Sequence, residues 1–145
     1  MSEAEQALSE NKELVRSFFE ALSSGDLDRV ASFFDERTTW TVCAVDILGA
    51  GTYTGAAIVE ELLRPVRGLF EPGQPTVAIK NVVAEGPWVA VEALGRGRFR
   101  NGAEYENQYS FVLELEGVTI RAIREYMDTH YAAASVTRGT AETPA

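Results

Sequence analysis

The sequence of 145 residues contains one cysteine and one histidine. A single cysteine, Cys43, excludes an internal disulfide, and its place inside an expected strand is typical of a small buried side chain rather than of a nucleophile. One cysteine and His130 cannot assemble a zinc site from the usual nitrogen and sulfur ligands, and no carboxylate cluster suggests another metal. We therefore predict neither a disulfide nor a metal site.

Positive charge is also scarce, with 13 lysines and arginines against 22 aspartates and glutamates and a net charge of −9. Such a chain repels nucleic acid and anionic membranes, so we expect neither as a partner. No apolar run approaches the length of a membrane span, and the acidic N-terminus has no signal-peptide core, which predicts a cytoplasmic protein. Gly95 and Gly97 lie within an expected strand with no helix after them, so we predict no nucleotide loop and no cofactor.

Hydrophobic periodicity predicts three helices followed by a run of strands. The first elements are a helix from about Glu10 to Gly25, a short helix capped by Asp26, a strand over 38–43, a glycine-rich loop over 46–54, and a helix over 56–70 that Pro65 kinks or ends. From Thr76 onward, turn signals at 85–87, 101–102 and 116–117 predict a four-stranded antiparallel meander. We predict one α+β domain over 1–133 and a flexible tail over 134–145.

The last predicted hairpin carries the strongest functional signal. Four residues of its first strand alternate and share one face: Tyr105, Asn107, Tyr109 and Phe111. Counting from a turn at 116–117, the partners of the first three on the second strand are Asp128, Tyr126 and Arg124. The opposite face is mostly charged and includes Glu125, so the first face is predicted to line a half-polar pocket. The same polar pairs could instead only rigidify the sheet.

Two registers are open for the strand that begins near Trp88. A two-residue turn at 101–102 would place Glu92 and Arg96 in the pocket, whereas a connection longer by one residue would place Val91 there. We favour the second register because it turns the more apolar face inward. Glu92 would then point outward, toward a dimer partner.

Four short motifs follow one another along the chain: GDLD at 25–28, GTYTG at 51–55, Y-x-N-x-Y-x-F from Tyr105, and REYMDT from Arg124. Together they resemble the nuclear transport factor 2-like superfamily, in particular its SnoaL-like and ketosteroid-isomerase-related branch. The resemblance implies a cone-shaped α+β barrel of the cystatin-like type, in which three N-terminal helices pack on a curved, mostly antiparallel sheet around a pocket. It also implies a homodimer formed through the outer face of the sheet.

The resemblance does not determine the reaction, because the superfamily includes isomerases, epoxide hydrolases, cyclases and proteins without catalysis. The carboxylate base of ketosteroid isomerases falls at Val42 and their oxyanion-hole tyrosine at Phe18, so their arrangement is not expected here. Of the Asp-Arg-Asp triad of limonene-epoxide hydrolases, only the last aspartate matches, at Asp128. The other two positions fall at Ala93 and Gly95.

The resemblance implies a cofactor-independent SnoaL-like cyclase or isomerase, including shape-driven ring closure, for a hydrophobic polyketide-type substrate of bacterial secondary metabolism such as antibiotic biosynthesis. Asp128 would be the general acid or base, Arg124 would lower its pKa, and Tyr109 and Asn107 would hydrogen-bond a carbonyl or enolate. The substrate would contact Phe18, Trp40, Val42, Leu62, Val91, Tyr105, Phe111 and Tyr126. Two alternatives remain: a non-catalytic binding or dimeric interaction domain, and an epoxide hydrolase in which Arg124 replaces the missing triad arginine.

Overall fold

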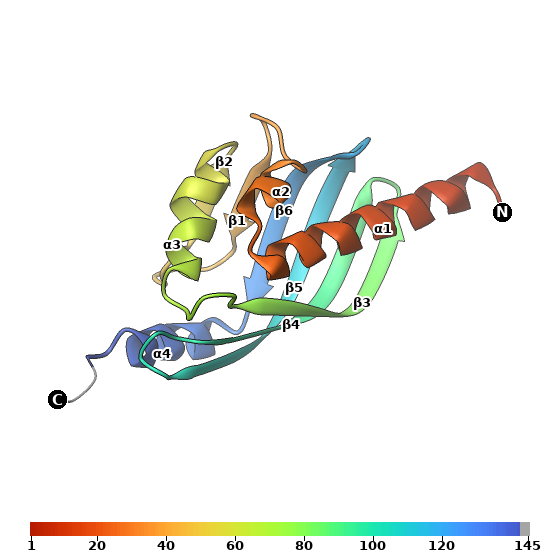
Figure 1. The fold of residues 1–145 in the computed structure, drawn as a ribbon. Coiled ribbons are helices and arrows are strands. Elements are labelled where there is room, and N and C mark those ends of the chain that lie inside the picture. The colour runs from red at the N-terminus through yellow and green to blue at the C-terminus, as the bar shows by residue number, and fades with distance from the viewer. Residues whose placement is uncertain (143–145) are drawn as a thin grey trace.

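The computed structural model describes residues 1–142, which form a layer of helices on one six-stranded sheet (Figure 1). In chain order the elements are α1 (Glu3–Ser24), α2 (Leu27–Ala31), β1 (Thr39–Val42), β2 (Gly51–Thr54), the π-helix η1 (Ile58–Leu63), α3 (Arg64–Arg67), β3 (Thr76–Glu85), β4 (Trp88–Arg98), β5 (Glu104–Glu116), β6 (Thr119–Met127) and α4 (Thr129–Gly139). The strand order is β2-β1-β6-β5-β4-β3, and within the described residues only β1 and β6 run parallel. The predicted α+β class, with helices on a mostly antiparallel sheet, is confirmed.

The N-terminal helices follow the predicted pattern, with one difference in length. α1 begins at Glu3 rather than near Glu10, because the Ser2 side chain accepts a hydrogen bond from the Glu5 amide and caps an exposed first turn. Its apolar face packs against the sheet, and its free N-terminal part projects beyond it (Figure 1). No helix among residues 1–142 is both long and apolar enough to cross a membrane.

Two short elements in the middle of the chain differ from the prediction. Residues 51–54, expected as part of a loop, form β2, an edge strand that pairs antiparallel with β1. The helix expected over 56–70 is a π-helical segment that continues into α3. Pro65 lies in the first turn of α3, where its missing amide proton breaks no hydrogen bond of that helix. The wider π-helical turn therefore ends at Leu63, and an α-helix with Pro65 in its first turn follows.

The C-terminal segment is a docked helix, so the predicted flexible tail over 134–145 was wrong for residues 134–139. Asp128 caps α4 by accepting a hydrogen bond from the Tyr131 amide at 3.0 Å. The buried face of α4 consists of the small residues Ala132, Ser135 and Gly139. A Cβ at Gly139 would lie 2.3 Å from Cγ of Phe99, so glycine is needed for this close approach. Residues 143–145 of the predicted tail lie outside the described residues.

The four-stranded meander is confirmed, and so is the favoured register between β4 and β5. Val91 pairs with Phe111 and Ala93 pairs with Tyr109, which places the apolar face of β4 inward. Glu92 points outward, where its carboxylate accepts a hydrogen bond from Asn81 at 3.2 Å. The inner face of β5 is also as predicted.

The predicted register between β5 and β6 was wrong, and the error reverses the face of most of β6. Leu115 pairs with Ile120, but Glu114 pairs with Ala122, so Arg121 is an extra residue in β6. Such a β-bulge shifts the alternation of all later residues by one. Glu125 consequently pairs with Phe111 on the inner face, and Arg124 and Tyr126 lie on the outer face.

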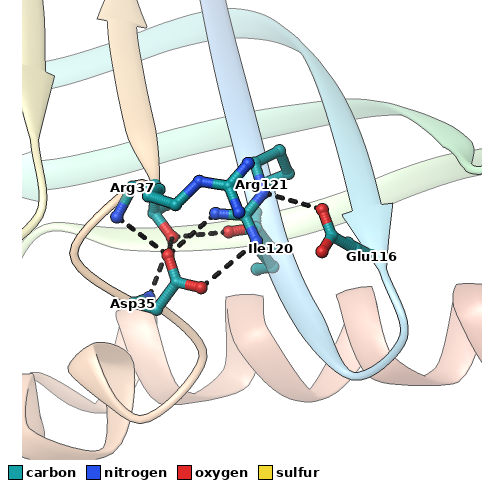
Figure 2. A network of polar contacts seen from close by, with 6 residues as sticks. Asp35, Arg37, Glu116, Ile120 and Arg121 are labelled. Carbon is teal, nitrogen blue, oxygen red and sulfur yellow. Dashed lines mark hydrogen bonds and ion pairs between the residues drawn. The ribbon is translucent and has the colours of Figure 1, made fainter.

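The bulge is held by the connection between α2 and β1. Figure 2 shows the Arg121 guanidinium between two carboxylates, with nitrogen–oxygen distances of 2.8 Å to Asp35 and 3.1 Å to Glu116. The hydrogen bond from Arg121 lowers the pKa of Asp35 to about 2. On the neighbouring residue, the Ile120 carbonyl accepts a hydrogen bond from the buried Thr38 hydroxyl at 2.7 Å. These contacts fix the residue that sets the orientation of Glu125.

Candidate active site

Two adjoining cavities lie between the helices and the inner face of the sheet. The first has a volume of about 130 Å³ and is lined by apolar side chains of η1, α3, α4 and the 43–50 loop, including Leu62, Val66, Ile47 and Val136. The second has a volume of about 100 Å³ and extends toward Trp40, Phe111 and the end of α1. Both are lined by Tyr105, Tyr109 and Glu125, so these three polar side chains form part of a shared wall.

Glu125 is the one carboxylate of residues 1–142 that lines either cavity. The indole nitrogen of Trp40 donates a hydrogen bond to its carboxylate at 3.0 Å. Burial raises the pKa of Glu125 to about 7, although the Trp40 hydrogen bond acts in the opposite direction. A carboxyl group with such a pKa is suited to act as a general acid or base near neutral pH.

The hydroxyl groups of Tyr105 and Tyr109 are hydrogen-bonded to each other, and the Asn107 amide orders this pair. The Asn107 oxygen accepts from the Gln108 amide at 2.8 Å, so its NH2 group donates to the Tyr105 hydroxyl at 3.0 Å. Tyr105 can then donate to Tyr109, which leaves the Tyr109 proton for a ligand. Burial raises the pKa of both tyrosines, so they remain protonated hydrogen-bond donors.

The packing of Tyr109 depends on a glycine of the neighbouring strand. A Cβ at Gly95 would lie 2.6 Å from Cε1 of Tyr109, so any larger residue would displace the ring. Gly95 is one of the two positions, with Ala93, at which this chain lacks a triad residue of the limonene-epoxide hydrolases. Here its lack of a side chain leaves room for the tyrosine that faces the cavities.

The structure brings together only part of the predicted site. Tyr105, Tyr109, Val42 and Leu62 line the first cavity, and Trp40 and Phe111 line the second. Phe18 and Val91 are fully buried in the core and line neither cavity. Asn107 is buried and orders the tyrosine pair rather than lining a cavity.

Three predicted residues lie elsewhere because of the bulge at Arg121. Arg124 is on the outer face, where its guanidinium lies over the Trp88 ring at 5.2 Å. Tyr126 is on the same face and is 43% exposed. Asp128 is exposed and caps α4, so neither it nor Arg124 reaches the cavities, and the rearranged triad is not formed.

Sequence analysis missed Glu125 by assigning it to the charged outer face. One signal could have revealed the bulge: Ile120 and Ile123 are apolar but three residues apart, which strict alternation would place on opposite faces. Both are fully buried, which requires an extra residue between them. Among residues 1–142 no three His, Cys, Asp or Glu side chains are grouped so as to hold a metal ion.

Comparison with known proteins identifies the family. The family model of the SnoaL-like domain matches residues 15–123, three quarters of the chain. This chain belongs to the SnoaL-like domain family. The predicted recognition is therefore confirmed, although the matched segment ends two residues before Glu125. A search of the curated proteins finds no match.

Solved structures support the same fold for this SnoaL-like protein. An NTF2-like protein from Burkholderia xenovorans is 27% identical over 88% of this chain and 96% of its own, with a TM-score of 0.71. An LEH-like epoxide hydrolase from M. tuberculosis is 21% identical over 92% and 93% of the two chains, with a TM-score of 0.70. A protein from Catenulispora acidiphila with a ketosteroid isomerase-like fold, solved with trimethylamine, is 19% identical over 85% and 91%, with a TM-score of 0.72. Because the last two proteins are less than 25% identical to this chain, their similarity shows a shared fold and nothing about function.

Proposed function

We propose that this SnoaL-like protein is a cofactor-independent enzyme that moves a proton on a small, largely apolar molecule carrying a ketone group. The observation that supports this most directly is the Glu125 carboxyl group, which lies in an apolar interior with its pKa raised to about 7 and shares a cavity wall with Tyr109. A titrating carboxylate beside a fixed hydrogen-bond donor is the arrangement that enolisation requires.

In the proposed reaction, the Glu125 carboxylate removes a proton from the carbon next to the carbonyl group. The electron pair of that C–H bond forms a C=C bond to the carbonyl carbon, and the π pair of the carbonyl moves to its oxygen, which gives an enolate stabilised by the Tyr109 hydroxyl. Where a C=C bond adjoins the deprotonated carbon, the enolate is conjugated, and Glu125 returns the proton to the far carbon of that bond, which completes an isomerisation. In a cyclase, the enolate carbon instead attacks a second carbonyl of the same molecule, and Glu125 protonates the resulting alkoxide.

The cavity volumes limit the size of the substrate. A cavity of about 150 Å³ holds one benzene ring, so cavities of about 130 and 100 Å³ each have space for at most one ring. A molecule occupying both would therefore have two rings at most, or one ring and a short chain. We propose a polyketide-type compound of that size from bacterial secondary metabolism as the natural substrate, rather than a polycyclic one.

The test is exchange of α-hydrogens for deuterium in D2O, followed by proton NMR with cyclohexanone as the one-ring probe and 2-tetralone as the two-ring probe. We expect Glu125→Gln to abolish the exchange and Tyr109→Phe to slow it by about 10²-fold. Glu92→Gln is the matched control, because Glu92 is an exposed outer-face carboxylate of the same chain. Exchange that is equally fast in Glu125→Gln and the control would contradict the proposal. Binding of both probes without exchange would favour a non-catalytic binding domain.

We also propose a homodimer through the outer face of the sheet. Two large side chains on this face are exposed, Trp88 by 39% and Tyr126 by 43%, and exposed aromatic groups of this kind mark contact surfaces. We expect Tyr126→Glu to shift the sedimentation coefficient from that of a dimer to that of a monomer.

A cytoplasmic location of the protein stays a prediction made from the sequence.

A further inference from the structure

Arg67, the last residue of α3, is fixed beside the end of α1. Its Nη1 donates hydrogen bonds to the Leu22 carbonyl at 3.0 Å and to the Pro75 carbonyl at 3.1 Å. The approach is close enough that a Cβ at Gly25 would lie 2.8 Å from Nη2, so the glycine leaves space for the guanidinium. The side chain is therefore held in one place before any ligand binds.

The charge of Arg67 has no counter-ion within residues 1–142. Other arginines of this acidic chain form ion pairs at the surface, including Arg64 with Glu60 and Arg121 with Asp35. No carboxylate pairs with Arg67, and its Nε and Nη2 have no acceptor in the described part of the chain. Burial lowers the pKa of Arg67, and the guanidinium still keeps its charge. A half-buried cation of this kind favours an anion from outside the chain.

Arg67 is also the one positively charged side chain that lines either cavity in residues 1–142. It lines the second cavity, of about 100 Å³, together with Glu125 and the apolar side chains of Trp40 and Phe111. Arg67 and Glu125 form no ion pair in the described part of the chain, and the cavity that both line has space for part of a ligand. We propose that Arg67 binds the carboxylate of the ligand, and that the substrate is an aromatic or aliphatic keto acid.

The two cavities place the parts of such a molecule in order. The carboxylate lies at Arg67 in the second cavity, the ketone lies at the shared wall beside Tyr109 and Glu125, and the apolar end lies in the first cavity. The N–H groups on Nε and Nη2 form no hydrogen bond within residues 1–142, and two such groups can hold one carboxylate in the two-pronged geometry that arginine favours. The position of the ketone rests on the proposed function, whereas the carboxylate site rests on Arg67 alone.

The experiment compares 4-oxo-4-phenylbutanoate with its uncharged primary amide by isothermal titration calorimetry. Wild-type protein is expected to bind the acid about tenfold or more tightly than the amide. Arg67→Met is expected to bind both equally, by weakening the acid only. Arg64→Met is the matched control, because it removes the same charge from the same helix at an exposed position, and it should keep the wild-type preference.

If Arg67→Met does not fold, Arg67→Lys takes its place. Lysine keeps the charge but cannot form the two-pronged contact, so we expect a preference for the acid over the amide that is weaker than that of wild type. Equal or undetectable binding of acid and amide by wild type, or a preference that persists in Arg67→Met, would overturn the proposal and leave Arg67 as a cap for α1. Glu125→Gln distinguishes the two proposals. It should lose α-hydrogen exchange of the acid while keeping the preference for the acid over the amide.

Discussion

Replacing Glu125 with glutamine is expected to stabilise the protein at alkaline pH. In the folded protein the pKa of Glu125 is raised from its ordinary value of 4.5 to about 7, because burial disfavours the charged form. Between these pH values the folded state holds a proton that the unfolded chain has released, so the free energy of unfolding falls as pH rises. Below the ordinary pKa this loss is absent, and above about pH 7 it is complete.

The expected size of the effect follows from the shift. Each pKa unit corresponds to about 1.4 kcal/mol, so the ionised Glu125 lowers the free energy of unfolding by about 3 kcal/mol. This value is an upper bound, because Glu125 is only partly buried and water in the cavities would hydrate its carboxylate. Glutamine carries no charge and keeps an oxygen that accepts the Trp40 hydrogen bond.

Urea denaturation of wild type and Glu125→Gln at about pH 5 and about pH 8 measures the effect. The variant should match wild type at the lower pH and exceed it at the higher one, whereas the outer-face control Glu92→Gln should differ from wild type by the same amount at both. In a Trp88→Phe background, Trp40 fluorescence should also titrate near pH 7 and lose this transition in Glu125→Gln. A difference between wild type and Glu125→Gln that is the same at both pH values would refute the reasoning.

Three further predictions concern the elements that surround the site. Asp128→Ala should lower the free energy of unfolding by about 1 kcal/mol through loss of the α4 cap. Asp128→Asn should keep both stability and α-hydrogen exchange, because asparagine also caps helices. Loss of exchange in a stable Asp128→Asn protein would instead indicate a catalytic role for Asp128. Asp35→Asn should lower the urea midpoint at neutral pH by removing the Arg121 ion pair. Because the pKa of Asp35 is depressed to about 2, the pair contributes fully above the ordinary value of 3.8 and is lost as pH falls through about 2, so variant and wild type should converge in strong acid. Gly139→Ala should cost about 1–3 kcal/mol in urea unfolding, because the new methyl group would overlap Phe99; an unchanged midpoint would show that α4 is not docked there.

The parts of the fold that were predicted correctly are those with a local signal. Apolar residues at helical or alternating spacing located α1, α2 and the four long strands, and the apolar face of β4 selected the correct register with β5. β2 and α4 lack such a signal. β2 is a short edge strand without a buried residue of its own, and α4 docks through small residues that give no apolar stripe.

The candidate site divides in the same way. The inner face of β5, with Tyr105 and Tyr109, follows from alternation along one strand and was predicted from sequence. The carboxylate opposite them was not, because the single extra residue at Arg121 reverses the faces of β6. That residue is held by Asp35, which lies 86 positions away in the chain. No local pattern contains an ion pair of that range.

The sequence by itself therefore determined the family, the α+β class and one wall of the pocket, because each depends on spacing within a short segment. Tertiary structure alone decided which carboxylate enters the cavities and which arginine faces it. Glu125 and Arg67 come to the same cavity from β6 and α3, and their surroundings come from a bulge, a helix end and a glycine that are distant in sequence. These surroundings exist only once those segments have packed together. Burial then raises the pKa of Glu125 and lowers that of Arg67.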